Sequence, residues 1–382
     1  FEAAAIAKQE LFETMLSGTF RSTAPRARAF ASGTSRRAFS LRVTGVEGRK
    51  IGENALEVTL KTNQDDQSQK YSAIVREKNP DRAVEALEVE ISPKIGALDP
   101  TDQRGIDNLL CSLDGTEDRS EFTPGAILGV SVAVAKLGAG ASGRKLAGYL
   151  ATIGKQDSLQ MPMPIGILPE LPMVSIIPFG DACFRDGIKR FQNLTENLSI
   201  NEDQTKSLKA QLRALMRPLK TNDMLGEVAL GVHLDRIEDR EQLVEFMNKF
   251  PVALLQMNDV DPEEGLALTL AVGEHLQICG GKSLYNSVDT IRATLDSGIV
   301  NSAVIDINSL GTVTAAFDAF DAVREFEGVA SMIWNAEKES EDMQEFLAHL
   351  ALSQSVAAVS VADFEGPFAK HLCELEAILD GR

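Results

Sequence analysis

The sequence lacks several features that would assign its class directly. It contains no uninterrupted run of about 18 apolar residues, so we predict no membrane-spanning segment. The cysteines are few and far apart, at Cys111, Cys183, Cys279 and Cys373. Because they show no CxxC spacing, they argue against a disulfide framework and indicate buried thiols in a reducing compartment.

Common motifs of catalytic centres are missing as well. The histidines stand apart in the sequence, at His233, His275, His349 and His371. No HExxH motif, Cys/His cluster, GxSxG elbow or Walker-type phosphate loop occurs. A GxGxxG is present at Gly138, Gly140 and Gly143, but the apolar residues before it keep helical spacing. We interpret it as the end of a buried helix, and we expect no cofactor.

What is present describes a globular protein of acidic character. The 382 residues are 44% hydrophobic and 25% charged, an ordinary balance for a folded chain. At roughly 100–200 residues per domain, this length predicts two or three domains. The formal net charge of -18 argues against a nucleic-acid partner, because a phosphate backbone would be repelled.

The first residues differ from the rest in charge. No acidic residue occurs between Glu13 and Glu47, and this stretch is rich in Arg, Ser and Ala, as organelle presequences are. Arg37 lies three residues before a candidate cleavage point after Phe39. We therefore expect residues 1–39 to be a mitochondrial transit peptide that sends the protein to the matrix. The alternative is a basic flexible arm that docks on an acidic partner.

Beyond this extension, the pattern predicts an α/β protein of two domains. A small α+β domain is expected over residues 40–155, with strands at 50–61 and 71–77 and helices at 81–94, 101–113 and 123–152. The Pro-rich segment 161–172 predicts a domain boundary, and a strand is expected at 173–179.

Residues 160–382 are expected to form a (β/α) barrel. From residue 227 onward, strand-like and helix-like segments alternate at the spacing of parallel strands with right-handed crossovers. Roughly six or seven such units suit a barrel. We expect this barrel to have a shortened or missing unit, around residues 199–226.

The carboxyl ends of barrel strands are where catalytic residues gather. The candidate positions there are His233, Gln256, Gly281, Asp306, Trp334 with Asn335, and Ala358. Asp306 is the single acid in this set, and none of the residues is Lys or Arg. A metal-dependent reaction would find few ligands among them.

Residues 106–139, IDNLLCSLDGTEDRSEFTPGAILGVSVAVAKLGA, closely resemble the enolase family, which has ID, then DGT, then AILGVSLAVAKA at this point. The segments 48–62 (GRKIGENALEVTLKT), 176–186 (IIPFGDACFRD) and 304–319 (VIDINSLGTVTAAFDA) are similar to other family segments in the same order. The resemblance covers roughly residues 45–380, and it implies an N-terminal α+β domain followed by an enolase-type barrel.

Enolases interconvert 2-phosphoglycerate and phosphoenolpyruvate with a lysine base, an acidic glutamate and carboxylate-bound Mg²⁺. Position by position, the resemblance places the three metal carboxylates on His233, Gln256 and Gly281. It places the catalytic lysine on Asp306 and the second lysine on Ala358. The His-Arg-Ser that binds the substrate phosphate falls on Asn335, Ala336 and Glu337, and the Gln-Glu pair falls on Pro172 and Met173. The acid-bearing loop has no counterpart, and the lid after the first strand is shortened to QDDQSQK.

We therefore expect a pseudoenzyme without enolase activity and without a bound metal. Its expected role is that of a structural or accessory subunit of a large mitochondrial assembly, a respiratory complex or ATP synthase rather than the ribosome. The expected partners are other subunits of that assembly, and an enolase-type homodimer remains open. Alternatives are a cytoskeletal, ciliary or regulatory binding module, or an enzyme with a changed reaction that uses Asp306, Asp235 or His233.

Overall fold

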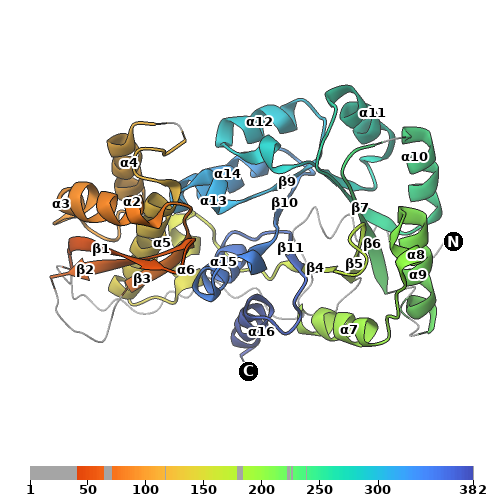
Figure 1. Cartoon of the computed structure of the whole chain (residues 1–382), viewed down its shortest axis with the longest axis horizontal. Coiled ribbons are helices and arrows are strands. Elements are labelled where there is room, and N and C mark those ends of the chain that lie inside the picture. Colours follow the sequence, from red (N-terminus) through yellow and green to blue (C-terminus); the bar gives the residue numbers. More distant parts are fainter. Residues whose placement is uncertain are drawn as a thin grey trace.

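The computed structural model describes residues 41–63, 71–116, 118–178, 184–221, 224, 227–237 and 239–381. They form a smaller N-terminal domain beside a larger barrel (Figure 1). The proposed transit peptide and most of the shortened lid lie outside the described residues.

The N-terminal domain starts with a three-stranded antiparallel sheet in the order β1-β2-β3. Its strands are β1 (Val43–Ile51), β2 (Ala55–Thr62) and β3 (Tyr71–Arg76). The prediction of one strand over 50–61 was wrong, because a turn at Gly52, which has a φ of +63°, divides this segment between β1 and β2. Gly52 and Asn54 are both typical turn residues, but the alternating apolar pattern on either side hid this signal.

Helices cover this sheet. They are α2 (Pro80–Glu85), a π-helical turn (Ala86–Ile91), α3 (Ser92–Ile95), α4 (Gln103–Asp114), α5 (Pro124–Ala141) and α6 (Leu146–Ile153). The GxGxxG segment ends α5, as predicted, and a Cβ at Gly138 would lie 2.2 Å from the Tyr149 hydroxyl. Among the described residues, α5 is the one helix long and apolar enough to cross a membrane, but 78% of it is buried within the fold, so it is a core helix.

The barrel sheet has eight strands in the order β8-β7-β6-β5-β4-β11-β10-β9. They are β4 (Met163–Ile167), β5 (Val174–Pro178), β6 (Val228–Leu234), β7 (Val252–Met257), β8 (Gln277–Cys279), β9 (Ser302–Val304), β10 (Ala330–Ile333) and β11 (Ala358–Val361). Strand β5 runs antiparallel to both neighbours, and the other paired strands are parallel. The fold prediction of an α+β domain followed by a barrel is thereby confirmed.

Two details of the barrel correct the sequence prediction. All eight barrel strands are present in the described residues, so no strand is missing there, and the described part of 199–226 contains α8 and α9. The shortest strands are β8 and β9, with three residues each, and the Asn301 amide just before β9 donates to the Ile278 carbonyl of β8 at 3.1 Å. The Pro-rich segment is not only a boundary, because it contains β4. Pro164 is tolerated there because the β4–β5 ladder involves only Gly166 and Ile167, so its missing N–H is not needed.

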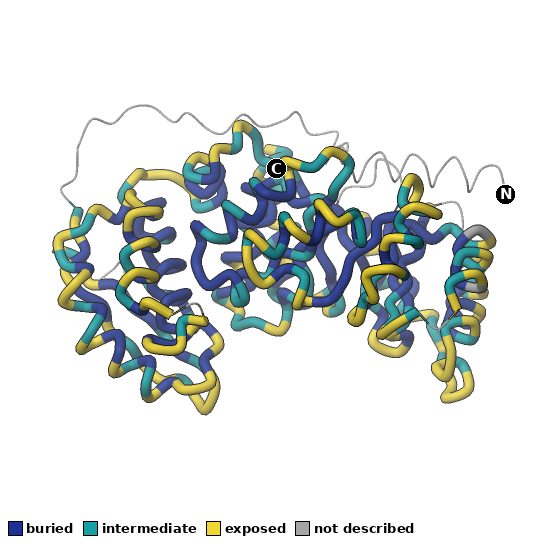
Figure 2. Tube along the Cα trace, turned by 90° about the horizontal axis from the view of Figure 1, so that it is seen from above, coloured by how far each residue is buried: buried dark blue, intermediate teal, exposed yellow. Residues whose placement is uncertain are grey.

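Helices surround the barrel. They are α7 (Phe184–Glu196), α8 (Glu202–Thr205), α9 (Leu208–Thr221), α10 (Arg240–Lys249), α11 (Pro262–Val272), α12 (Val288–Asp296), α13 (Ile307–Leu310), α14 (Val313–Arg324), α15 (Glu341–Ser353) and α16 (Pro367–Leu379). Buried segments run through both domains, and the exposed segments lie mainly on the outer helices and loops (Figure 2).

The barrel interior is filled by small and apolar side chains. They are Met163, Ile165, Ile177, Ala229, Ala253, Leu254, Cys279, Ala330, Met332 and Ala358. This packed layer leaves no channel, so the polar chemistry of the barrel is confined to the strand ends.

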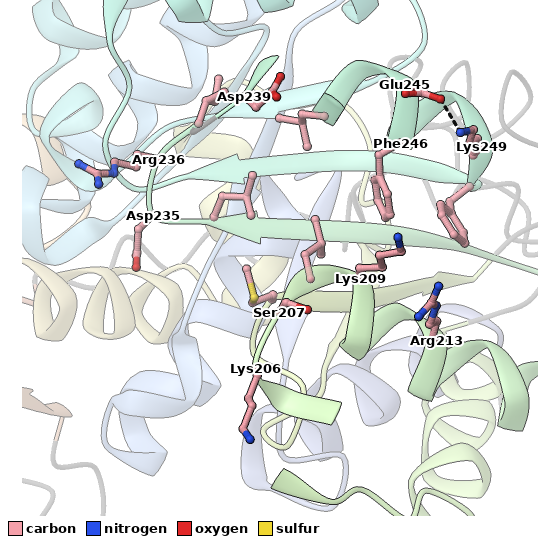
Figure 3. Close-up of a pocket in the computed structure, with 16 residues that line it drawn as sticks. Lys206, Ser207, Lys209, Arg213, Asp235, Arg236, Asp239, Glu245, Phe246 and Lys249 are labelled. Carbon is pink, nitrogen blue, oxygen red and sulfur yellow. Dashed lines mark hydrogen bonds and ion pairs between the residues drawn. The ribbon is translucent and has the colours of Figure 1, made fainter. Parts of the chain in front are cut away.

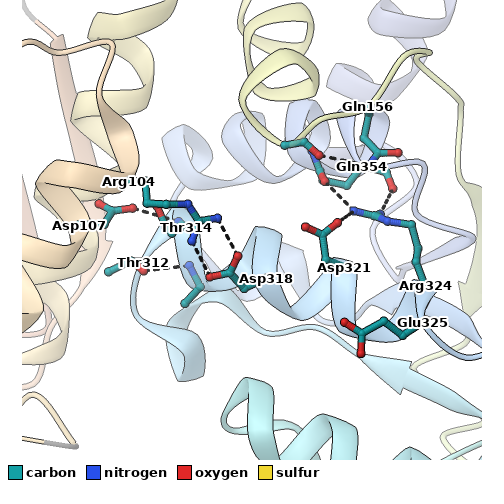
Figure 4. A network of polar contacts seen from close by, with 12 residues as sticks. Arg104, Asp107, Gln156, Thr312, Thr314, Asp318, Asp321, Arg324, Glu325 and Gln354 are labelled. Carbon is teal, nitrogen blue, oxygen red and sulfur yellow. Dashed lines mark hydrogen bonds and ion pairs between the residues drawn. The ribbon is translucent and has the colours of Figure 1, made fainter.

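A polar network joins the two domains at the start of α14 (Figure 4). The buried Asp107 carboxylate accepts a hydrogen bond from the Thr314 amide at 3.0 Å, and the Ser131 hydroxyl accepts one from the Val313 amide at 2.9 Å. Nearby, Arg104 binds both carboxylate oxygens of Asp318, at 2.9 and 2.7 Å. Side chains of the N-terminal domain therefore satisfy the free amides at the N-terminus of a barrel helix.

Candidate functional site

The candidate site lies where the carboxyl ends of the barrel strands meet the N-terminal domain. His233 of β6 and Gln256 of β7 are register partners, so their side chains are neighbours. His233 Nδ1 lies 3.0 Å from Gln256 Oε1, and Nε2 lies 2.8 Å from the Ser175 hydroxyl. Gln256 also donates to Asn258 Oδ1 at 3.0 Å. The first two metal positions implied by the resemblance are thus occupied by a network of neutral hydrogen bonds.

Burial keeps the imidazole in this network uncharged. It lowers the pKa of His233 to about 4, and the hydrogen bond that His233 donates to Gln256 opposes this shift only in part. The ring of His233 also lies against the indole of Trp334, with ring centroids 5.6 Å apart. A neutral His233 that donates through Nδ1 to Gln256 and accepts at Nε2 from Ser175 satisfies every contact of the ring.

This contact gives a direct test, because Trp334 is the single tryptophan of the chain. A protonated imidazole quenches indole emission, so we expect the fluorescence of Trp334 to stay constant from about pH 8 to about pH 5.5 and to fall only toward pH 4. Since folding lowers the pKa of His233 below its unfolded value of about 6.5, protonation opposes folding, and up to about 3 kcal/mol of stability is lost as the pH falls from 6.5 to 4.

The control for this titration is His233→Gln, in which the fluorescence change near pH 4 should disappear. Circular dichroism measured in parallel separates quenching from unfolding. A midpoint near pH 6.5 would show that His233 is solvated and would contradict the hydrogen-bonded arrangement.

The third implied metal position has no room for a side chain unless the backbone shifts. A Cβ built on Gly281 would lie 2.1 Å from the backbone carbonyl oxygen of Asn258. Mg²⁺ requires oxygen ligands in near-octahedral geometry, usually from carboxylates. His233, Gln256 and Gly281 do not supply this donor set. Across the residues that the structure describes, no group of three or more His, Cys, Asp or Glu side chains could hold a metal ion.

Asp306 stands at the position of the implied lysine base and has a structural role. Its carboxylate lies 2.6 Å from Lys282 Nζ and accepts from the Asn308 amide at 3.1 Å, which caps α13. Burial alone would raise the pKa of Asp306, but Lys282 and Asn308 outweigh it and the pKa is lowered. The residue is therefore a fixed anion, opposite in charge to an ammonium group.

The implied phosphate site is filled by a carboxylate of the chain itself. Glu337 accepts hydrogen bonds from the Ala362 amide at 2.8 Å and from the Asp363 amide at 3.1 Å. Burial raises the pKa of Glu337, and these two backbone bonds partly oppose the shift. Asn335 has a left-handed backbone, with a φ of 57°, and Ala336 is buried. An incoming phosphate would meet a bound carboxylate here instead of an arginine.

Strand β11 carries two residues that bear on the site, Ala358 and Ser360, and they lie at different depths in the barrel. Ala358 is fully buried in the barrel interior and pairs with Met332, which also pairs with Val304. Two residues further along, the strand end of β11 carries Ser360, whose hydroxyl accepts from the Asn335 amide at 2.8 Å. Ser360 is therefore the residue of β11 that contacts the strand-end residues, and Ala358, where the resemblance places the second lysine, lies in the barrel interior.

The remaining predicted positions lie beside this cluster. The Met173 carbonyl accepts from the His233 amide at 2.9 Å, and Pro172 before it is exposed. Neither side chain carries a carboxyl or amide group that could act on a substrate. All the predicted site residues thus gather at one end of the barrel except Ala358, which lies deeper.

A cleft of about 750 Å³ separates this end of the barrel from the N-terminal domain. Its walls include Arg76, Lys282, Asp306, Asn308 and Glu339. The Glu339 side chain is 8% exposed and lies 3.8 Å from Arg76, and burial raises its pKa. Glu339 could not be predicted as a site residue, since the polar sequence of residues 339–342 (ESED) does not indicate that its first side chain is buried.

Comparison with known families identifies both domains. The domain described as "Enolase, N-terminal domain" matches residues 51–150, and "Enolase, C-terminal TIM barrel domain" matches residues 232–362. Both domains are those of the enolase family. A relative named "Enolase", from Thermococcus gammatolerans, is 26% identical over 353 residues, which cover 78% of this chain and 81% of that protein.

Within this enolase-family chain, the motifs that carried the resemblance are parts of the scaffold. Asp114 of the DGT motif accepts from the Phe122 amide at 2.7 Å and so shapes the loop before α5. Phe184 of the FRD motif is buried, and its amide donates to Glu376 of α16 at 2.5 Å. A Cβ at Gly129 of the AILGVS motif would lie 2.4 Å from Val58. The retained residues hold the fold together, and the altered residues lie at the strand ends.

Proposed function

We propose that this chain is a catalytically inactive member of the enolase family that serves as a structural subunit of a larger mitochondrial assembly. The proposal is supported by the kinds of side chain that occupy the carboxyl ends of the barrel strands. The three metal positions hold a neutral histidine, a glutamine amide and a glycine without room for a side chain. The position of the base holds Asp306, already paired with Lys282.

The enolase reaction removes a proton from the carbon next to a carboxylate, and this C–H group has a very high pKa. Removal of the proton requires both a base and metal charge to stabilise the enolate-like intermediate. Each electrostatic contribution of this kind is worth about 3 kcal/mol or more of barrier. Loss of the metal ligands, the base and the phosphate site together removes enough stabilisation to abolish turnover.

What the chain retains is a stable scaffold with a strongly acidic surface. Its net charge of -18 disfavours contact with RNA, so a respiratory complex or ATP synthase fits better than a ribosome. The Arg-rich, acid-poor segment between Glu13 and Glu47 supports delivery to the mitochondrial matrix.

A second candidate is favoured by the cleft of about 750 Å³, which offers Asp306, Lys282 and Glu339 to a small polar ligand. A carboxyl group with a raised pKa beside an ion pair can transfer a proton, so an enzyme with a changed reaction is the alternative. A ligand that protects the chain from thermal unfolding, and loses this effect in Glu339→Gln, would favour this alternative.

The proposal predicts that the purified full chain with Mg²⁺ and 2-phosphoglycerate shows no turnover above a blank without protein. The Thermococcus gammatolerans relative, assayed in parallel, is the reference protein. A tagged chain in detergent-solubilised mitochondria is expected to migrate with a large complex on native gels. Measurable turnover, or migration only as a monomer or dimer, would contradict the proposal.

A further inference from the structure

One surface of this acidic protein is strongly basic. It lies on α9 and the turn before it, and its five basic residues are Lys206, Lys209, Arg213, Arg217 and Lys220. We call these five residues the basic stripe. Their spacing of three or four residues places successive members on one side of the helix, and all five are exposed. From Lys206 to Thr221 the sequence contains no acidic residue.

The charge of the basic stripe is largely uncompensated. Lys206 lies 2.6 Å from Asp203, an exposed pair of little energetic weight. In the part of the chain that the structure describes, no ion pair joins the other four to an acid. The opposite side of α9 buries Leu212, Leu215 and Leu219 in the barrel wall, so the helix is anchored and the stripe faces outward.

An apolar groove runs beside the stripe. It has a volume of about 950 Å³ and lies between α9 and α10, with an apolar floor of half-buried side chains that includes Leu208, Phe246 and Phe250. Its rim is charged and carries the acids Asp235, Asp239 and Glu245 as well as cations, so a docked helix must place its acidic side chains on the α9 side of the groove. The rings of Phe246 and Phe250 are 4.6 Å apart. In Figure 3 the side chains of Lys209 and Arg213 rise from α9 toward α10, so cations border the apolar floor.

The location leaves this groove accessible. Helices α9 and α10 lie at the edge of the barrel farthest from the N-terminal domain (Figure 1), so the cleft with Asp306 and the groove are separate surfaces. None of the five residues of the basic stripe belongs to the strand-end site. The groove reaches the strand-end site at Met173, but the basic stripe does not, so the stripe requires an explanation that the strand-end site does not give.

We infer that the basic stripe and the groove dock an acidic amphipathic helix of a partner subunit. Lys209 to Lys220 spans about 17 Å of helix, which matches about three turns of a docked helix. Apolar side chains of that helix would enter the groove at i, i+3, i+4 and i+7, and its Asp and Glu residues would face the stripe. The inference rests on the proposed role as a subunit and names the chemistry of its partner.

The net charge of the chain favours an acidic protein helix over a nucleic acid or an anionic membrane as the partner. A nucleic acid or an anionic membrane would extend beyond the stripe and meet a chain whose net charge is -18. A short acidic helix contacts the stripe alone, and only a partner with apolar side chains would use Phe246 and Phe250. A protein helix is therefore the occupant that satisfies both the cations and the groove.

The test compares two charge reversals of equal size. The stripe variant carries Lys209→Glu, Arg213→Glu and Lys220→Glu. The control variant carries Lys94→Glu, Lys155→Glu and Lys370→Glu, which are exposed cations on other surfaces. Both are expressed as full tagged chains in mitochondria, and circular dichroism of the purified proteins verifies that they fold.

We expect the stripe variant to lose at least tenfold in the fraction that migrates with the large complex, while the control variant keeps the wild-type fraction. Carboxyl-to-amine cross-linking of the wild-type complex should join Lys209 or Lys220 to acidic residues of a helical segment. Equal assembly of the two variants would overturn the docking inference but leave the proposed function intact. A wild-type chain that never joins a complex would overturn the proposed function instead.

A binding measurement with a defined probe tests the docking surface independently of any assembly. The probe is a fluorescent 18-residue peptide with Leu and Glu at helical spacing, compared with a shuffled peptide of the same composition. We expect the amphipathic peptide to bind at least tenfold more tightly than the shuffled one, and the stripe variant to lose this binding. Equal binding of both peptides, tighter binding of single-stranded DNA, or self-association that the stripe variant abolishes would each contradict a partner helix.

Discussion

Gly281→Asp is expected to destabilise the protein by about 3–5 kcal/mol, because the new side chain must displace backbone and then bury a carboxylate. A Cβ at this position would lie 2.1 Å from the Asn258 carbonyl oxygen, and backbone atoms cannot move aside as the end of a side chain can. Gly281 is buried, so the charge would also be removed from water. Urea unfolding of the variant and the wild type measures the loss.

Two companion variants make this result interpretable. Gly281→Ala should lose about 1–3 kcal/mol, because the clash begins at Cβ and needs no charge. Gly148→Asp is the control, because a Cβ on Gly148 meets nothing within 4 Å, and its effect should stay below about 1 kcal/mol. If Gly281→Asp were as stable as the Gly148→Asp control, a carboxylate would fit at position 281, and lack of space would not be what excludes it.

The same geometry predicts the result of an attempt to restore catalysis. The triple variant His233→Asp, Gln256→Glu and Gly281→Asp supplies the carboxylates that the family resemblance implies, yet we expect no turnover of 2-phosphoglycerate. The third carboxylate has no space, and Asp306 remains in place of the base. Turnover by this variant would show that the scaffold is still poised for the ancestral reaction.

The features that sequence reasoning could predict are those that depend on periodic patterns. Strand and helix alternation predicts the barrel, and the end of each apolar strand predicts that His233, Gln256, Gly281 and Asp306 lie at strand ends. Those four residues do lie at the carboxyl ends of β6 to β9, because apolar strands in a barrel end where their buried run ends.

Other features could not be predicted, since they depend on contacts between distant segments. Which residue of β11 reaches the strand-end site follows from the register of β11 with β10, in which Ala358 pairs with Met332, and the sequence AAVSVADF does not reveal this register. Glu337 becomes the occupant of the implied phosphate site only because two backbone amides of the 362–363 loop meet it. The basic stripe was hidden in what the sequence showed as a long polar helix, because only the fold reveals which side of α9 is buried.

Asp107→Ala is the second variant with a large expected effect, a loss of about 3–4 kcal/mol in the free energy of unfolding. Asp107 is 1% exposed and accepts from Thr314 at the start of α14 and from the Gln103 amide group, 3.1 Å from each carboxylate oxygen. Its removal leaves the Thr314 amide without an acceptor and takes one acceptor from Gln103, whose amide still donates to the Ser131 carbonyl at 3.0 Å. An unsatisfied buried donor costs about 1–3 kcal/mol, and the cavity left by the carboxylate adds to this loss.

Two further substitutions distinguish the stability contributed by the buried hydrogen bonds of Asp107 from that of the exposed ion pair at the same domain interface. Asp107→Asn should lose no more than about 1 kcal/mol, because burial raises the pKa of Asp107 and a neutral amide of equal size avoids that penalty while still accepting from Thr314. Arg104→Ala removes a bidentate but largely exposed ion pair with Asp318 and should also lose less than about 1 kcal/mol.

The measurement is urea unfolding of all three variants, followed by circular dichroism and by the emission of Trp334, which reports on the barrel alone. Because Asp107 and Thr314 belong to different domains, Asp107→Ala should also uncouple them, so that the two signals no longer change together. A single coincident transition with a loss near that of Arg104→Ala would show that the network is not what joins the domains. A separated transition would show that Asp107 and Ser131 serve the scaffold by joining its two domains, whether or not the barrel catalyses a reaction.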